Sequence, residues 1–175
     1  SDRTTWALAA WEVYKTTGDR EWLQKAYTII KNSAADDYKT IRNAQTNLYG
    51  GESSFLDWRE QTYPKWMSNM DIYVSQNLGT NVVHYQTHQI LSKMAILLGE
   101  PHEQYDKIAS QIKKAINDQL WIEEKGYYAQ YLYGKNFFVQ SKRYEALGEA
   151  LAVLFDVADV KQSKMILSQS PLTEY

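Results

Sequence analysis

The chain has 175 residues, 44% of them hydrophobic and 23% charged, with a formal net charge of −2. This length suits one domain or a large piece of one, and the apolar content together with 14% aromatic residues excludes a disordered chain. Lysine and arginine number 19 against 21 acidic residues and form no basic block, which argues against a nucleic-acid binder. No stretch approaches the roughly 20 apolar residues that span a bilayer, and the absence of cysteine excludes disulfides and thiol catalysis.

Six helices are predicted from the spacing of apolar residues and from the stop signals that follow them. They are expected at 3–17, 19–44, 80–98, 101–120, 143–157 and 159–169. Gly18 and Gly99 end the first and third helices, and Asp19 caps the second. A loop of mixed character is expected at 52–77. Two aromatic runs around a glycine-containing turn predict a small β-hairpin at 127–140.

The predicted helices alternate between two kinds. The first, third and fifth are apolar on nearly every side, which is typical of helices that are buried on every side. The other three carry one apolar stripe and are expected at the surface. Short links join each inner helix to an outer one, whereas long loops at 47–77 and 121–142 lead back inward, so function is expected on the loop side. The pattern predicts an all-α fold of helical hairpins, and uneven turn spacing favours a closed ring over a solenoid.

Both ends of the sequence resemble internal segments of a domain rather than natural chain termini. A helix begins within the first residues, and the last residues form a loop around Pro171. We therefore expect residues 1–175 to be a single partial domain, truncated at both ends. Half a ring would expose the apolar flanks of its inner helices, so self-association through these edges is also expected.

Two segments resemble the six-hairpin glycosidases, a superfamily that includes trehalases, processing α-glucosidases and glycogen-debranching relatives. Asp-Arg-Thr-Thr-Trp-Ala-Leu at 2–8, with Thr-Gly-Asp at 17–19, resembles the start of an inner helix and its turn to the outer one. Glu-Ser-Ser-Phe-Leu-Asp-Trp-Arg at 52–59 is similar to a Glu-Ser-Gly-Trp-Asp stretch whose Asp is the general acid. It departs from that stretch by one extra residue, by Ser54 in place of Gly and by Phe55 in place of Trp.

This resemblance implies an (α/α)6 toroid, of which about three of the six hairpins are present. It implies a glycoside hydrolase that acts on α-linked sugars or oligosaccharides, typically with inversion and without a cofactor, with Asp57 as the general acid. The segment that supplies the base has no clear counterpart and is expected beyond Tyr175. The resemblance favours a periplasmic or secreted location over a cytoplasmic one.

Glycoside hydrolysis usually needs two carboxyl groups across the scissile bond, about 6.5–9.5 Å apart in inverting enzymes. The aromatic neighbours of Asp57 would raise its pKa and keep it protonated, although a helix cap or a surface carboxylate would also explain an Asp there. Arg59 is expected to bind sugar hydroxyls or to hold Glu52 or Glu60, and Glu52 is itself a candidate substrate-binding residue. Glu145 is the reserve candidate for a second carboxylate, but it precedes an inner helix, where capping is the simpler explanation.

Aromatic residues are more numerous than a core of this size needs, with 6 Trp, 14 Tyr and 4 Phe. Three of them follow Asp57 closely, namely Trp58, Tyr63 and Trp66. Their flat faces suit stacking on a sugar ring, and pinning the loop to the core would explain them equally well. The resemblance to the six-hairpin glycosidases implies a carbohydrate partner, and these side chains are then candidate subsites.

Asn81 and His84 are expected to face the mouth of the ring, where they would hydrogen-bond substrate. His88 follows His84 at the spacing of a zinc protease helix, but Tyr85 takes the place of the general base and no further ligand is evident. No metal site is therefore predicted. Three other functions stay open: a sugar epimerase or isomerase that uses His84 or His88 as acid and base, a non-catalytic helical scaffold, and a glycan-binding module.

Overall fold

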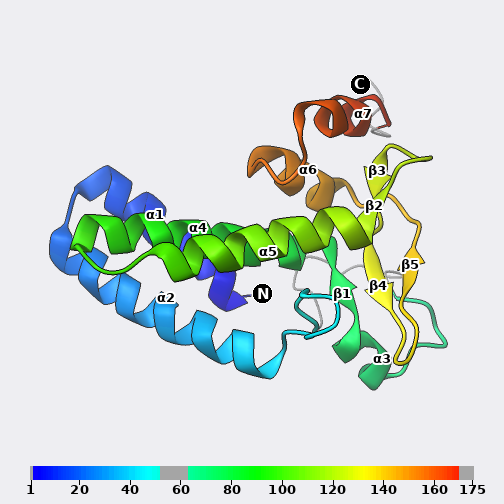
Figure 1. The fold of residues 1–175 in the computed structure, drawn as a ribbon, viewed down its shortest axis with the longest axis horizontal. Helices are drawn as coiled ribbons and strands as arrows, with labels where there is room; N and C mark the ends of the chain where they lie inside the picture. The colour runs from blue at the N-terminus through cyan, green and yellow to red at the C-terminus, as the bar shows by residue number, and fades with distance from the viewer. Residues whose placement is uncertain (1, 52–62, 170–175) are drawn as a thin grey trace.

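The structure is a computed structural model that describes residues 2–51 and 63–169. Three inner helices alternate along the chain with three outer ones. The inner helices are α1 (Asp2–Thr17), α4 (Leu78–Leu98) and α6 (Ala146–Leu154), and the outer ones are α2 (Arg20–Thr40), α5 (Glu103–Leu120) and α7 (Val160–Gln169). Helix α4 contacts α1, α2, α5 and α6 (Figure 1). This arrangement confirms the predicted, mostly helical fold of inner and outer helices.

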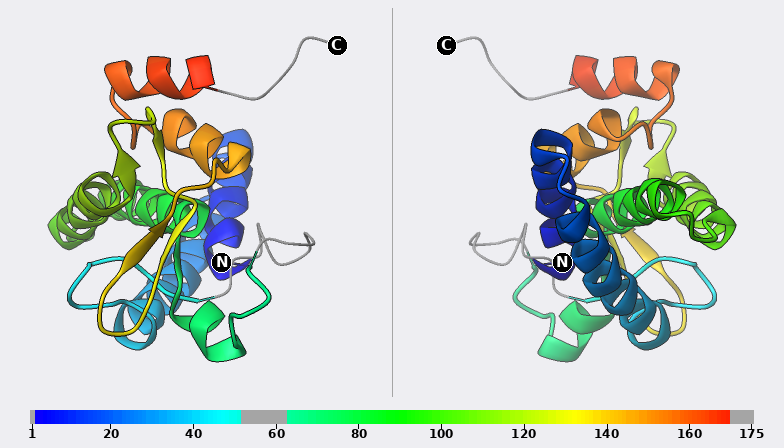
Figure 2. Two further views of the ribbon diagram at one scale, coloured as in Figure 1. Left: turned by 90° about the vertical axis from the view of Figure 1, so that its right-hand side faces the viewer. Right: turned by 90° about the vertical axis from the view of Figure 1, so that its left-hand side faces the viewer.

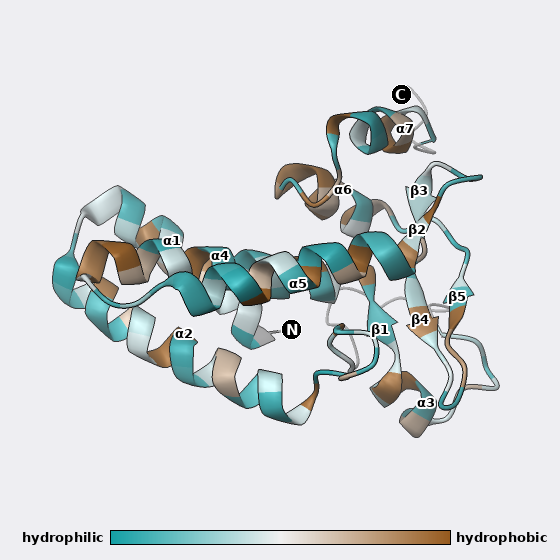
Figure 3. Ribbon diagram, viewed as in Figure 1, coloured by the Kyte–Doolittle hydropathy of each residue, from teal (hydrophilic) through white to brown (hydrophobic). Residues whose placement is uncertain are grey.

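Helix α4 forms the centre of the structure. Its residues from Leu78 to Ala95 are almost all buried, on every face of the helix. The outer helix α5 instead buries a single stripe that includes Ile112 and Ile116, and polar residues cover its outward side, as Figure 3 shows. The different apolar patterns of these two helices therefore match their positions, as predicted from the sequence.

Helices α1 and α6 are not buried on all sides, and exposed flanks on the inner helices are also what a partial ring leads us to expect. Ala7 and Ala10 of α1 are buried, but Trp6 and Val13 are exposed. Helix α6 is strongly apolar (Figure 3), yet Leu154 is 68% exposed. The physical reason is their position: among the described helices, α4 is the inner helix that both α1 and α6 pack against.

The short links between helices follow the predicted caps. Asp19 accepts hydrogen bonds from the backbone N–H groups of Glu21 and Trp22 at the start of α2. Gly99 ends α4 in the left-handed conformation, with φ of 72°. Helix α2 ends at Thr40 rather than at 44, because the side chain of Asn43 accepts backbone hydrogen bonds that form a turn.

The long loops gather at the other end of the helices, on the right of Figure 1. They contain a short helix, α3 (Asn69–Val74), and two small antiparallel sheets. The first sheet has the order β1-β4-β5 and the second pairs β2 with β3. The strands are β1 (Gln76–Asn77), β2 (Trp121–Ile122), β3 (Tyr127–Tyr128), β4 (Tyr131–Tyr133) and β5 (Val139–Ser141).

The predicted hairpin at 127–140 is therefore only partly right. Strands β4 and β5 form it around Gly134, which has a φ of 115°. Tyr127 and Tyr128 belong to the other sheet, where they pair with Trp121 and Ile122. The loop predicted at 52–77 also contains α3 and β1. The backbone carbonyl of Gln130, just before β4, accepts the N–H of Leu78 and so satisfies one of the free N–H groups in the first turn of α4.

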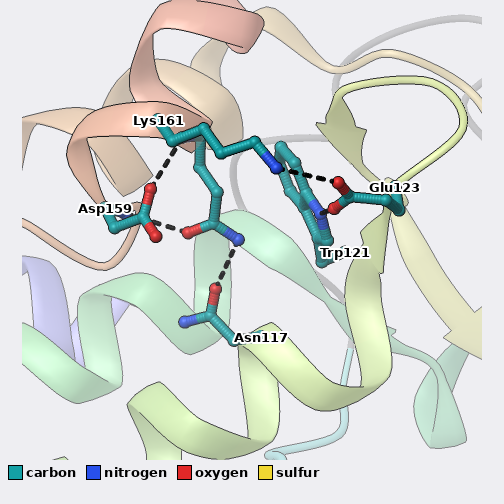
Figure 4. A network of polar contacts seen from close by, with 6 residues as sticks. Asn117, Trp121, Glu123, Asp159 and Lys161 are labelled. Atoms are coloured by element: carbon teal, nitrogen blue, oxygen red, sulfur yellow. Dashed lines mark hydrogen bonds and ion pairs between the residues drawn. The ribbon is translucent and has the colours of Figure 1, made fainter.

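Helix α7 is held by polar contacts with the end of α5 and with β2 (Figure 4). Asp159 and Gln162 cap each other at its start, and the amide of Gln162 donates a 2.9 Å hydrogen bond to Asn117. Glu123 accepts hydrogen bonds from the indole of Trp121 and the ammonium of Lys161. Across residues 2–51 and 63–169, no helix has the length and apolar character needed to cross a membrane.

Candidate functional site

The side chain of Asn81 links the loop after α2 to the start of α4 through hydrogen bonds. Its side-chain oxygen accepts the backbone N–H of Tyr49 at 2.7 Å, and its amide donates to the carbonyls of Tyr49 and Asn77. Asn81 is fully buried. This predicted site residue thus lies in the first turn of α4, and its side chain hydrogen-bonds to backbone groups of Tyr49 and Asn77.

His84 lies one turn further along α4 and stacks on the ring of Tyr49. The ring centroids are 3.9 Å apart and the planes are 10° from parallel. His84 is 1% exposed, and its Nε2 has no hydrogen-bond partner among the described residues. Burial, followed by the nearby His88, holds the pKa of His84 well below its usual range. The imidazole is therefore neutral at physiological pH and is covered by Tyr49.

Four predicted site residues, Glu52, Asp57, Trp58 and Arg59, lie outside the described residues. The described residues on either side of 52–62 are both at the loop end of the structure. Gly51 donates its N–H to the carbonyl of Ser75 and accepts a hydrogen bond from the Asn77 amide. Tyr63 lies against Tyr131 of β4, with ring centroids 5.6 Å apart. The chain thus leaves and rejoins the described structure beside the start of α4.

Tyr63 and Trp66 precede α3 and pack against two tyrosines of β4. We term these four residues, Tyr63, Trp66, Tyr131 and Tyr133, the aromatic cluster. Trp66 lies 5.6 Å from Tyr133, and the Tyr131 and Tyr133 rings are 6.1 Å apart. Tyr131 is buried, whereas Trp66 is 62% exposed. The cluster therefore has an anchored base and an exposed indole face, which is the form of a surface that can stack on a sugar ring.

Glu145 caps helix α6, as the simpler explanation predicted. Its side chain accepts hydrogen bonds from the backbone N–H groups of Leu147 and Gly148. The carboxylate is buried, and it is stabilised by the positive end of the helix dipole. The structure therefore gives Glu145 a structural function at the start of an inner helix.

Glu149, one turn after Glu145 on α6, is a buried carboxyl group that the sequence analysis did not single out. It is fully buried, and its Oε1 accepts the backbone N–H of Tyr128 at 2.8 Å. Burial raises the pKa of Glu149 to about 8, assisted by Glu145 and opposed by the Tyr128 N–H. At neutral pH this side chain is mainly protonated. The sequence could have indicated its burial, because Glu149 is an acidic residue inside the apolar helical run 146–154.

The raised pKa of Glu149 predicts a specific pH dependence of stability. Because the folded state favours the protonated form, the stability contribution is complete below the unfolded pKa of about 4.5 and is lost as pH rises towards 8. The expected loss is about 1.4 kcal/mol per pH unit across this window. Melting temperatures of the wild type and Glu149→Gln between pH 4.5 and 9 test it. The variant should lose this slope, and an unchanged slope would contradict the assignment.

Asn81 and His84 lie in the first turns of α4, and Tyr63 and Trp66 lie against β4, whose partner strand β1 directly precedes α4. His88 lies one turn deeper along α4 and faces a different part of the structure, between α2 and α5. Tyr49, which covers His84, was not predicted, because a single aromatic residue before Gly50 carries no distinctive pattern. Within the described ranges, no three acidic or histidine side chains are placed to hold a metal ion.

Comparison with known proteins gives one family match. The model of the bacterial α-L-rhamnosidase six-hairpin glycosidase domain matches residues 3–169. A periplasmic trehalase of Salmonella newport (strain SL254) is 25% identical over 126 residues, which cover 69% of this chain and 21% of that protein. A periplasmic trehalase of Salmonella schwarzengrund (strain CVM19633) is similar to the same extent.

A solved structure has the same fold. The GH78 family rhamnosidase of Bacillus sp. GL1 superposes with a TM-score of 0.73 at 19% identity, and the match covers 97% of this chain and 17% of that one. The chain therefore spans about a fifth of the length of the trehalases and less of the rhamnosidase.

Proposed function

Because the chain belongs to the bacterial α-L-rhamnosidase six-hairpin glycosidase family, we propose that it forms part of the catalytic domain of a glycoside hydrolase that acts on α-linked sugars. The proposal is supported by the arrangement of aromatic residues at the loop end of the helices. There, the exposed face of Trp66 lies in the aromatic cluster beside the points where the segment 52–62 joins the described structure. A carbohydrate substrate suits such a surface.

In this proposal Asp57 is the general acid that protonates the leaving oxygen. A second carboxylate, outside residues 1–175, activates water on the opposite face of the sugar, and the reaction inverts the anomeric centre. Arg59 and Glu52 position the substrate, and Trp58 stacks on it together with the aromatic cluster. Asn81 and His84 do not contact substrate in this proposal. Asn81 holds the backbone of Tyr49, and the Tyr49 ring covers His84, so both residues fix the position of the loop after α2.

The names of the relatives suggest two substrates to test first, an α-L-rhamnoside and trehalose. The experiment incubates the intact enzyme with aryl α-L-rhamnosides, aryl α-glucosides and trehalose, and follows the released sugar by NMR. Release of free sugar whose first-formed anomer is inverted supports the proposal. Release with retention would overturn the inverting mechanism, and products that keep their linkages would overturn hydrolysis itself.

Trp66 gives a prediction that separates substrate binding from stability. Trp66→Ala should raise KM by about 3–10-fold, the equivalent of losing one aromatic stacking contact, and should leave kcat within about twofold. Its exposure means that the melting temperature should change little. Trp66→Phe is the matched control, because it keeps a flat ring and should recover most of the affinity. An unchanged KM in the alanine variant would remove Trp66 from the subsite.

The epimerase alternative requires His84 or His88 to reach a sugar. These side chains are 1% and 3% exposed, and burial lowers the pKa of both imidazoles. His84 is covered by Tyr49, and His88 lines a separate pocket between α2 and α5, away from the aromatic cluster, so neither imidazole lies at the proposed sugar subsite. A periplasmic or secreted location is proposed on the similarity to periplasmic trehalases.

A further inference from the structure

A small cavity of about 200 Å³ lies on the outer wall, far along α4 from its N-terminal end. We term it the α2–α5 pocket. Ala34, Ala35 and Tyr38 of α2 line one side, Tyr105 and Ile108 of α5 line the other, and His88 of α4 contributes to the lining. Helices α2 and α5 diverge here, as Figure 1 shows, and the lining includes the small side chains of Ala34 and Ala35.

His88 is the unusual member of this lining. Its side chain is 3% exposed, and both ring nitrogens lack a hydrogen-bond partner among the described residues. Leaving a buried polar group unpaired costs about 1–3 kcal/mol, so such groups usually have a partner. Burial lowers the pKa of His88 to about 4, so its neutral ring offers one donor and one acceptor at physiological pH.

The remaining lining defines what the pocket can accept. Its walls are apolar and aromatic, formed by Tyr38, Tyr105, Ile108 and the alanines, which suits a flat ring. Lys31 and Lys39 of α2 line the pocket as well, and neither forms an ion pair with any residue in 2–51 or 63–169. The volume is below the roughly 300–1,000 Å³ of pockets for drug-sized ligands, which limits the occupant to about one ring.

We propose that the α2–α5 pocket binds a small aromatic carboxylate with a hydroxyl group at the opposite end of its ring. The ring lies between Tyr38 and Tyr105, the hydroxyl group hydrogen-bonds to His88, and the carboxylate is held by Lys31 and Lys39. The pocket lies on the outer wall, on α2 and α5, whereas the aromatic cluster lies on β4 and its neighbouring loop. This binding site is therefore independent of the proposed hydrolase reaction.

Isothermal titration calorimetry of the intact protein with 4-hydroxybenzoate tests the proposal. Saturable binding is expected, with phenol and cyclohexanecarboxylate binding at least threefold more weakly, because phenol lacks the carboxylate and cyclohexanecarboxylate lacks the flat ring and hydroxyl. No binding up to about 10 mM 4-hydroxybenzoate would overturn the proposal. Equal binding of the three compounds would also overturn it, because it would show no recognition of charge or ring.

Variants locate the binding. Ala35→Trp fills the pocket from an exposed position and should abolish binding without unfolding the protein. His88→Leu should weaken binding about fivefold, the loss expected for one neutral hydrogen bond. Lys31→Gln combined with Lys39→Gln should weaken binding about threefold or more, whereas Lys25→Gln, on the same helix outside the pocket, is the matched control. Binding that survives Ala35→Trp unchanged would contradict the assignment to this pocket, and hydrolase turnover should be unchanged in that variant.

Discussion

Replacing Asp57 by Asn in the intact enzyme is expected to lower kcat by about 10²–10⁴-fold, the usual contribution of a general acid. The amide cannot donate a proton to the leaving oxygen. The loss should therefore be largest for substrates with poor leaving groups, such as alkyl glycosides, and much smaller for dinitrophenyl glycosides, which leave without protonation. The basic limb of the pH–rate profile should also disappear. Steady-state kinetics on the two substrate types measure both effects.

Asp118→Asn is the matched control for this experiment. Asp118 is an exposed carboxylate near the C-terminal end of α5 that pairs with Lys114 one turn earlier. Its removal should leave kcat within about twofold, because exposed ion pairs of this kind contribute little. Turnover of the Asp57 variant within about threefold of wild type, or an equal loss on both substrate types, would contradict the proposed acid.

Tyr49→Ala is expected to give the largest loss of stability, about 3–5 kcal/mol. The tyrosine ring is fully buried and packs face to face on His84. Its removal leaves a cavity at the point where the loop after α2 meets α4, and it uncovers the neutral imidazole. Chemical denaturation followed by circular dichroism measures the change, with activity recorded in parallel.

Tyr49→Phe separates the contribution of the hydroxyl group from that of the ring. The hydroxyl of Tyr49 is buried without a hydrogen-bond partner among the described residues, and burial raises its pKa above the usual range. Removing an unpaired buried hydroxyl should be neutral or slightly stabilising. A loss of more than about 1 kcal/mol in Tyr49→Phe would mean that the hydroxyl has a partner. A loss below about 1 kcal/mol in Tyr49→Ala would contradict the packing role of the ring.

Local chemistry explains why the helices were predictable. Gly18, Asp19 and Gly99 define helix ends through backbone conformation and caps, which depend only on neighbouring residues. The apolar pattern of α4, which runs through every face, similarly predicts its central position. The same pattern was misleading for α1 and α6, because the burial of a helix depends on neighbours that its own sequence does not specify.

The loop end was less predictable because its structure depends on contacts between distant segments. Tyr128 pairs with Trp121 rather than continuing the β4–β5 hairpin, and β1 joins β4 from more than fifty residues away. Two further contacts also join segments that are distant in the sequence: Tyr49 stacks on His84, and Glu149 accepts a hydrogen bond from the backbone of Tyr128. A sequence shows that such residues are aromatic or acidic, but it does not show which partner buries them.

The central position of α4 also determines how the structure opens. A helix enclosed by four others can expose its amide groups to exchange with solvent only when the packing around it is lost. Helix α7 is joined to the rest by polar contacts around Gln162 and Lys161 and by the buried side chain of Ile166, so it can detach with less packing lost than α4. Helices α4 and α5 are joined by the short link between Leu98 and Glu103 and pack against each other. Contacts between segments that are close in sequence cost little chain entropy to form, so this hairpin is expected to form early in folding. The loops that we propose contact substrate are therefore supported by the most persistent part of the chain.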